Sequence, residues 1–313
     1  MSVSDLDVVE NTILAPYTTF QLGGPCKGLL FCQSPKDLEY TIKQLAADNE
    51  RFILIGGGSN LVISDQGVDC YVVRYATQNP LIECSGNKIT VAASVSLDVL
   101  AEFATEKGLA GLTCLSGIPG TVGGAVVGNA GAFGKQIGDV IETVEVITPQ
   151  GQLKTLSKED CGFSYRDSRL KETKDIVMAI TVSLAATEVA QSVAQRPEIL
   201  ALRREKHPDL MEHPCAGSFF RNIEPTSSAE KRQAAGWFLD QAGGKELSHG
   251  GAKIFEKHAN IIVKGDACTA QDVYELHVKM AYLVKKKFDL DLVREVRFVG
   301  SFSGEIGKQD IIW

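Results

Sequence analysis

Two glycine-rich segments contain the residues best suited to hold an anion. The first, residues 56–61, directly follows the apolar run at 52–55. The second lies within residues 108–134, a stretch of 27 residues with nine glycines and no charged side chain. Glycine tolerates positive φ and lets the backbone approach a ligand closely, so successive N–H groups can converge on one anion. Two such segments in one chain predict a site for a nucleotide or dinucleotide diphosphate rather than two ordinary tight turns.

The uncharged stretch is long enough to suggest a membrane span, but its composition predicts otherwise. Its glycines and Pro119 give little support to a continuous helix, and its apolar residues are too sparse. Neither glycine segment matches the G-x-G-x-x-G motif of the common dinucleotide-binding fold. We therefore expect the diphosphate site to belong to another α+β architecture.

The composition indicates a globular protein and argues against several classes of function. The 313 residues suffice for about two domains, and 44% hydrophobic with 23% charged residues is ordinary for a globular chain. A formal net charge of −7 predicts no nucleic-acid partner, because such binding needs excess basic surface. The acidic N-terminus lacks the pattern of a signal peptide. The eight cysteines form no C-x-x-C pair and the five histidines no H-E-x-x-H motif, so we expect reduced thiols, a cytoplasmic location and no metal site.

Hydrophobic patterning predicts a β-rich first part of the chain, followed by a more helical part. The predicted strands span residues 27–32, 52–55, 61–63, 70–75, 81–84, 88–93, 143–148, 152–156 and 176–184. The predicted helices span about 35–49 (with Ser34 as N-cap), 96–107, 188–206, 228–242 and 269–287. A last strand is expected over 290–299 and a tail over 301–313. The change of pattern places a domain boundary near residues 186–190.

Eight groups of short motifs follow one another along nearly the whole chain. They are NTI…TFQLGG (11–24), GGGSNL (56–61), GIPGTVGG (117–124), NAGAFG (129–134), YRDS (165–168), GSFFRN (217–222), GA…HAN (251–260) and EVR…G (295–300). In this order they resemble the family of UDP-N-acetylenolpyruvoylglucosamine reductases, flavoenzymes of bacterial peptidoglycan precursor synthesis. Each motif alone is weakly specific, whereas eight in family order make a specific match.

The chain departs from the family pattern at several positions. It has Gly128 where the family usually has Met, Phe133 for Tyr, His207 for Gln, Arg221 for Lys and Arg294 for Pro. None of these changes removes a chemical group that the reaction needs. The uninterrupted GSFF spelling resembles the shorter form of the family, which has no inserted substrate lid.

The resemblance implies an α+β fold with two domains. An FAD-binding domain of the vanillyl-alcohol-oxidase (PCMH) type would span residues 1–187 in two subdomains, split near 60–75. A C-terminal α+β substrate-binding domain would span 188–300, with a tail over 301–313. The implied reaction is the NADPH-dependent reduction of UDP-N-acetylglucosamine enolpyruvate to UDP-N-acetylmuramate through non-covalently bound FAD. No membrane, nucleic acid or obligate protein partner is expected.

Reducing an enolpyruvyl ether requires three groups. They are a cation that faces the substrate carboxylate, a hydrogen-bonding acid near it and a proton donor above the carbon. The resemblance puts Arg166, Glu295 and Ser218 in these positions. Glu295 also shares a predicted strand face with Arg297, so a solvated ion pair between them is the plainer alternative.

Local sequence alone favours structural roles for the other two residues. Arg166 would form a surface ion pair with Asp167 or Glu172. Ser218 would cap a turn, because serine is a poor acid unless a neighbour polarises it.

For the ligands, the resemblance implies a larger set of contacts. FAD would be held by Gly56, Gly57, Gly58, Ser59, Asn60, Leu61, Gly117, Ile118, Pro119, Gly120, Thr121, Gly123, Gly124, Asn129 and Ala130. The diphosphate of the nucleotide sugar would be held by Arg204, Lys206, Arg221 and Asn222. A solvated charged helix face is the alternative for these cations, and only one of Arg203 and Arg204 is expected to face the pocket squarely.

Two other functions remain open on sequence grounds. A flavin-dependent oxidase on the same fold would not need the Arg166, Ser218 and Glu295 set. It would typically attach its flavin covalently through a histidine or cysteine, and the glycine segments contain no histidine. A catalytically silent flavin or nucleotide-sugar sensor would retain the motifs without turnover.

Overall fold

The computed structural model describes residue 3 and residues 6–77, 79, 81–225 and 231–304. The described strands are β1 (Val8–Glu10), β2 (Cys26–Cys32), β3 (Phe52–Ile55), β4 (Leu61–Ile63), β5 (Val68–Tyr75), β6 (Ile82–Ser85), β7 (Lys88–Ala92), β8 (Leu109–Ala110), β9 (Gly131–Ala132), β10 (Lys135–Gln136), β11 (Ile141–Ile147), β12 (Leu153–Ser157), β13 (Ile176–Ser183), β14 (Ala185–Ala186), β15 (Cys215–Ser218), β16 (Ser248–His249), β17 (Ala252–Phe255), β18 (His258–Lys264) and β19 (Arg297–Val299).

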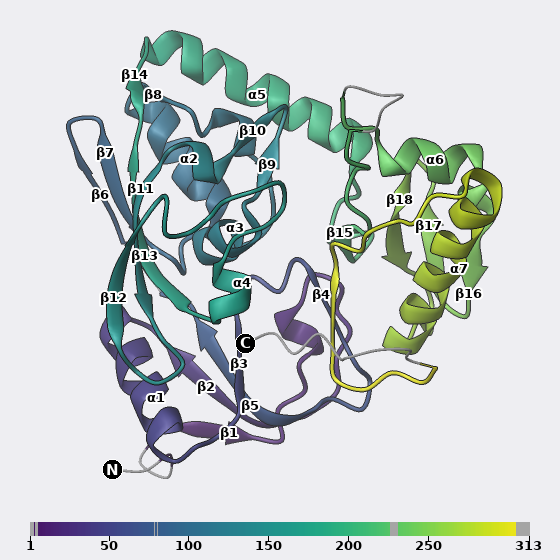
Figure 1. Ribbon diagram of the computed structural model, residues 1–313, viewed down its shortest axis with the longest axis horizontal. Helices are drawn as coiled ribbons and strands as arrows, with labels where there is room; N and C mark the ends of the chain where they lie inside the picture. Colours follow the sequence, from purple (N-terminus) through teal and green to yellow (C-terminus); the bar gives the residue numbers. More distant parts are fainter. Residues whose placement is uncertain (1–2, 4–5, 78, 80, 226–230, 305–313) are drawn as a thin grey trace.

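The described helices are α1 (Pro35–Ala47), α2 (Leu97–Glu106), α3 (Val122–Gly128), α4 (Leu170–Thr173), α5 (Val189–Lys206), α6 (Ala235–Gln241) and α7 (Ala270–Phe288), with short 3-10 turns η2 (Ala15–Tyr17), η3 (Thr113–Leu115), η4 (Ile137–Asp139) and η5 (Gly244–Glu246). Helices and strands are intermixed along the chain and pack together, which confirms the α+β class (Figure 1). Within the described ranges, no helix combines the length and apolar character needed to cross a membrane.

The first sheet has the strand order β1-β2-β5-β3. Strands β2 and β3 run parallel to β5, and β1 is antiparallel to β2. Helix α1 begins at Pro35 because the Ser34 side chain accepts a hydrogen bond from the Asp37 N–H at 3.1 Å, as predicted. Its buried residues Leu38 and Ile42 belong to a core that extends into the second sheet.

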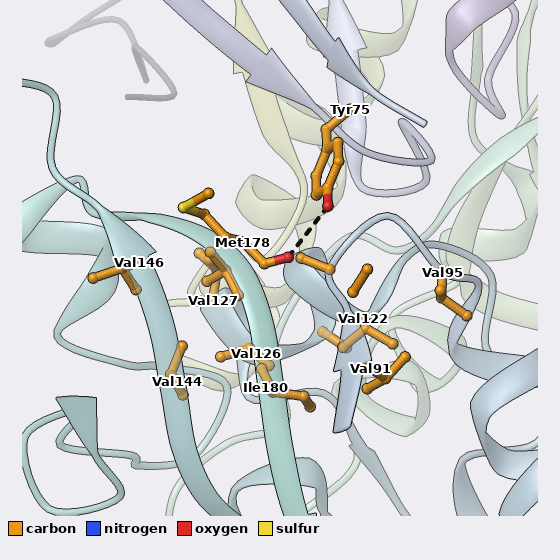
Figure 2. Packing of buried hydrophobic residues seen from close by; sticks show 14 of the residues in the cluster. Tyr75, Val91, Val95, Val122, Val126, Val127, Val144, Val146, Met178 and Ile180 are labelled. Atoms are coloured by element: carbon orange, nitrogen blue, oxygen red, sulfur yellow. Dashed lines mark hydrogen bonds between the residues drawn. The ribbon is translucent and has the colours of Figure 1, made fainter. Parts of the chain in front are cut away.

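The second sheet is antiparallel, with the order β12-β11-β13-β7-β6. Figure 2 shows valines of β7, β11 and α3 packed on both sides of Ile180 and Met178 in β13. Tyr75, at the end of β5, donates a hydrogen bond to the Met178 carbonyl at 3.4 Å (Figure 2). The first two sheets therefore share one core, and the buried side chains of α3 pack into it.

The third sheet, β15-β18-β17-β16, is antiparallel and lies with α6 and α7 at the other side of the molecule (Figure 1). Long helix α5 leads toward it from β14 (Figure 1). The core between the third sheet and its helices includes Phe20, Leu22 and Val62 from the N-terminal part of the chain. In the parallel pair β4–β19, Val62 lies opposite Phe298. This pair connects the N-terminal part of the chain to the segment that follows α7.

Most predicted elements are present, with bounds that differ by one or two residues. The helix predicted over 228–242 is wrong in extent: α6 begins only at Ala235, because Gln233 and Ile223 exchange backbone hydrogen bonds of 2.9 and 3.1 Å. Residues 228–230 of that prediction lie outside the described residues. The strand predicted over 290–299 is reduced to β19, because residues 293–295 pair only in isolated contacts with 219–221. Strands β15 to β18 were not predicted.

Candidate active site

A cavity of about 810 Å³ opens where both glycine segments, the C-terminal end of α5, the end of β15 and the segment before β19 meet. Most residues predicted to contact the cofactor line it. They are Gly56, Gly57, Gly58, Ser59, Asn60, Leu61, Gly117, Ile118, Pro119, Gly120, Thr121, Gly123, Gly124 and Ala130. The glycine segments are therefore not separate turns but two walls of one cavity.

The two glycine segments contact each other through bare backbone. A Cβ added to Gly57 would lie 2.9 Å from the Gly120 Cα, which is too close for real atoms. Gly120 has φ +116°, and a Cβ there would lie 2.5 Å from the Ser59 Oγ. The Ser59 hydroxyl donates to the Pro119 carbonyl at 3.0 Å and links the segments. This contact explains why glycine is required at both places.

Asn129 does not line either cavity described here, although it was predicted to contact the cofactor. Its side chain is fully buried, donates to the Ser164 carbonyl at 2.6 Å and accepts from the Gly138 N–H at 3.0 Å. The residue ends α3 in a left-handed conformation with φ +45°. Its side chain supports the turn that follows Ser164 from behind the cavity wall.

Arg166 lies in that tight turn. Ser164 and Asp167 exchange backbone hydrogen bonds of 3.0 and 3.2 Å, and Arg166 between them has φ +55°. Its Nε lies 3.3 Å from the Glu295 Oε1, with the two side chains 25% and 26% exposed. The same Nε makes no hydrogen bond in the described part of the chain. The ion pair predicted from local sequence, with Asp167 or Glu172, is replaced by this pair with Glu295.

Glu295 is a carboxyl group held in a partly enclosed, cationic setting. Burial raises the pKa of Glu295, whereas the positive charges of Arg166, Arg221 and Lys171 oppose that rise. The residue lies just before β19, so its predicted place on one strand face with Arg297 is wrong. A carboxyl group with a raised pKa can stay protonated and donate a hydrogen bond.

Ser218 ends β15 and pairs with Ile261 of β18. The preceding Gly217 has φ +77°, which turns the chain at the cavity wall. The next residue, Phe219, accepts a hydrogen bond at its carbonyl from the Glu295 N–H at 2.7 Å. Two segments that are far apart in sequence thereby set the Ser218 hydroxyl and the Glu295 carboxyl on one wall.

A second cavity of about 420 Å³ adjoins the first. Arg166, Ser218 and Glu295 line both cavities, so they lie where the two spaces meet. The smaller cavity is otherwise lined mainly by polar and aromatic residues, which include Tyr165, Asn222, Trp237, Asp240, Lys245, Lys257, His258 and Asn260. This arrangement allows a ligand in one cavity to react with a ligand in the other at the three shared residues.

The predicted cations lie in different places. Lys206 lines neither cavity. Arg203 and Arg204 both line the larger one, although only one of the two was expected to face the pocket squarely. The Nε and Nη2 atoms of Arg203 are buried and have no hydrogen-bond partner among the described residues. Its guanidinium lies 6.0 Å from the ring centre of Phe133. A buried cation with unused donors at a cavity wall is suited to an anionic ligand.

Arg221 lines neither cavity, although its charge acts on Glu295 from nearby. Asn222 lines the smaller cavity, and its N–H donates to the Tyr165 hydroxyl at 3.3 Å. Lys171 was not predicted, yet it lines the larger cavity. No local pattern marks Lys171, because it becomes significant only when the turn before α4 folds back. In the described part of the chain, no group of three or more His, Cys, Asp or Glu residues is arranged to hold a metal ion.

Comparisons with known proteins agree with this geometry. Residues 26–157 match the model of an FAD binding domain, and residues 209–299 match the C-terminal domain of UDP-N-acetylenolpyruvoylglucosamine reductase. The reductase of that name from Carboxydothermus hydrogenoformans is 36% identical over 293 residues, covering 94% of each chain. The one from Bacillus licheniformis is 35% identical, again over 94% of each chain. The crystal structure of the Thermus caldophilus reductase is 30% identical and superposes with a TM-score of 0.77, covering 94% of this chain and 100% of that one.

Proposed function

This chain belongs to the family of UDP-N-acetylenolpyruvoylglucosamine reductases, and from that premise we propose which of its residues perform the reaction. It is an oxidoreductase of peptidoglycan precursor synthesis that binds FAD and uses NADPH as the hydride donor. It reduces UDP-N-acetylglucosamine enolpyruvate to UDP-N-acetylmuramate. The observation that supports our assignment of residues is that Arg166, Ser218 and Glu295 line both cavities.

The larger cavity fits FAD. Its glycine segments bring bare backbone to the cavity wall, and Arg203 offers buried donors that have no partner in the described chain. Both features suit a pyrophosphate. The N–H groups of Gly117, Gly123 and Gly124 already donate to Asp98, Ala93 and Thr121, so the donors left for a ligand lie elsewhere in the two segments. We assign the glycine segments, with Ser59, Asn60 and Ala130, to FAD binding. Bound there, FAD would supply the hydride carrier between NADPH and the substrate.

Three side chains would serve the enolpyruvyl group. The Arg166 guanidinium binds the substrate carboxylate through its planar fork and stabilises the negative charge that develops there. Burial raises the pKa of Glu295, which favours its protonated form, and in that form it donates a hydrogen bond to the same carboxylate. The Ser218 hydroxyl delivers a proton to the carbon beside the one that receives hydride. The Arg166–Glu295 pair of 3.3 Å opens when the substrate carboxylate enters.

We assign the smaller cavity to the nucleotide sugar. Asn222 lines it, and Lys257 adds positive charge to its wall, whereas Lys245 is paired there with Asp240 at 3.1 Å. Arg204, Lys206 and Arg221 remain our candidates for the diphosphate. Of these, Arg204 is supported by its place at the larger cavity, which opens into the smaller one at the shared residues.

The assignment is tested by following NADPH oxidation by the purified protein with and without UDP-N-acetylglucosamine enolpyruvate. We expect NADPH loss that depends on this substrate. Peroxide formation without the substrate would instead indicate a flavin-dependent oxidase. No turnover would indicate a catalytically silent sensor.

We also propose that FAD is bound non-covalently, because the glycine segments contain no histidine and Cys114 is the one thiol within them. Acid denaturation should release all yellow colour into the supernatant, and colour kept in the pellet would contradict the proposal.

A cytoplasmic location is supported by eight free cysteines, which suit a reducing compartment. We keep the domain division at residues 187 and 188 and the shorter, lidless form as proposals.

A further inference from the structure

We propose that Lys171 is a positioning residue for the reduction: its ammonium group holds the Arg166 turn in place and adjusts the charge around Glu295. The proposal rests on the roles given above to Arg166 and Glu295. It concerns a residue that no motif of the sequence singled out.

Lys171 makes two contacts with the turn. Its Nζ donates to the Arg166 carbonyl at 2.6 Å and lies 3.0 Å from the Asp167 Oδ1. The Lys171 side chain is only 17% exposed and lines the larger cavity. A lysine so enclosed loses hydration, so its position requires compensating partners. Both partners are supplied by the turn that carries the candidate carboxylate-binding residue.

The turn is fastened to the protein on three sides. Asn129 donates to the Ser164 carbonyl at 2.6 Å, and Ser168 donates to the Val127 carbonyl at 2.7 Å. Only the third bond, from Lys171, acts on Arg166 itself. A non-glycine residue in the left-handed region is disfavoured, and a charged donor on its carbonyl offsets that cost.

The charges facing Lys171 come from several elements. Burial lowers the pKa of Lys171, Asp167 opposes that change, and Arg221 and Arg297 reinforce it. Arg166 shares the cavity wall. Asp167 thus favours the charged form of Lys171, against the effects of burial and of the neighbouring arginines.

The positive charge of Lys171 also acts on Glu295. Arg166, Arg221 and Lys171 are the charges that hold down the pKa of Glu295 against the effect of burial. Removing one of them leaves Glu295 protonated to a higher pH. A residue that only stabilised the fold would not move this titration.

The experiment compares two variants with the natural holoenzyme in rapid-mixing measurements of flavin absorbance. Lys171→Met should slow reoxidation of reduced flavin by UDP-N-acetylglucosamine enolpyruvate about 10²-fold, as expected for a displaced binding group. The pH at which that rate falls on the alkaline side should move upward, because Glu295 loses a neighbouring positive charge. Flavin reduction by NADPH should be unchanged. Lys171→Arg keeps the charge, so it should keep the natural pH dependence and recover part of the rate.

Lys158→Met is the matched control, because Lys158 also donates to a backbone carbonyl, that of Asp139 at 2.9 Å, but on the exposed surface. It should leave the rates and the pH dependence unchanged. A Lys171→Met enzyme with natural rates and pH dependence overturns the proposal. If both Lys171 variants fail to retain flavin, Lys171 is structural and the proposal is also overturned. If the natural protein itself is not reoxidised by the substrate, the proposed function fails instead.

Discussion

The side-chain amide of Asn60 donates a hydrogen bond to the backbone carbonyl of Glu295 over 3.2 Å. The backbone carbonyl of Asn60 also accepts a hydrogen bond from the Arg297 N–H at 3.0 Å. The first glycine segment and the segment that contains the candidate acid are therefore fixed to each other directly. Because β4 and β19 continue this contact as a parallel pair, the cofactor wall and the substrate wall cannot move apart without breaking both.

Asn60→Ala should weaken this connection. Loss of one hydrogen bond should lower the free energy of unfolding by about 1 kcal/mol. Substrate-dependent flavin reoxidation should slow as well, because Glu295 loses a fixed position. Asn87→Ala is the control, since the Asn87 amide donates to the Leu184 carbonyl at 3.1 Å far from the cavity. It should lose comparable stability in urea unfolding but retain the reoxidation rate; equal losses of rate in both would contradict the role of Asn60.

The sequence predicts those parts of the site that depend on local backbone geometry. The glycine segments at 56–61 and 117–124 were expected to hold a diphosphate, and they do form two walls of one cavity. The reason is that glycine permits positive φ and close backbone approach, and this property belongs to the residue itself rather than to its distant neighbours. The predicted strand at 52–55 and the Ser34 cap are local in the same sense.

Contacts between distant segments were not predictable from local patterns. Glu295 was expected beside Arg297 on a strand face, but it lies before that strand and pairs with Arg166 at 3.3 Å. Alternation in the sequence identifies an extended segment, whereas its partner is decided by packing of the whole chain. For the same reason Asn129 matched a motif and still turned out to be buried behind the wall.

Gly57→Ala should abolish or strongly weaken FAD binding. The added Cβ would meet the Gly120 Cα at 2.9 Å, and backbone cannot rotate away as a side chain can. The two glycine segments would be pushed apart at the place where they form the cavity. The flavin content of the purified protein and titration of the apoprotein with FAD measure this effect.

Gly86→Ala provides the matched control for that experiment. Gly86 has φ +62° in the turn between β6 and β7, and a Cβ there would meet nothing within 4 Å. This substitution should cost about 1 kcal/mol in the free energy of unfolding because of its backbone conformation. FAD affinity should be unaffected. A Gly57→Ala protein with the same FAD affinity as Gly86→Ala would show that the close contact is not required.

His277 should make the protein less stable in acid. The His277 ring packs among aromatic residues that include Phe298, and the centres of these two rings are 4.8 Å apart. Burial lowers the pKa of His277 from 6.5 to about 4. The Tyr274 carbonyl raises this pKa and the Arg294 charge lowers it further. As pH falls below 6.5, the unfolded chain binds a proton that the folded chain excludes. The free energy of unfolding should therefore decrease by up to about 1.4 kcal/mol per pH unit until pH 4 is approached.

Urea unfolding at pH 7 and pH 5 measures this effect. His277→Phe removes the titrating group while keeping an aromatic ring, so its stability should decrease less between the two pH values than that of the natural protein. His213→Gln, at an exposed position, should keep the natural difference. If His277→Phe also keeps it, the acid sensitivity arises from other groups.

Ser218→Ala should separate the two half-reactions. NADPH reduces the flavin before enolpyruvyl chemistry begins, so this step should proceed at nearly the natural rate. Reoxidation by the substrate should slow by roughly 10²- to 10⁴-fold, as is typical when a positioned proton donor is lost. Ser218→Cys should retain more activity, because a thiol can still deliver a proton. Rapid mixing with flavin absorbance as the signal resolves both steps.

The position of Ser218 makes the outcome decisive between two roles. Its strand is paired with Ile261, and the neighbouring Phe219 carbonyl holds the Glu295 N–H at 2.7 Å, so the alanine variant keeps the backbone contacts of the wall. A normal reoxidation rate in that variant would make Ser218 a turn residue and Glu295 or a bound water the proton source. Loss of both half-reactions together would mean that the substitution damaged the cavity wall, and would say nothing about the proton.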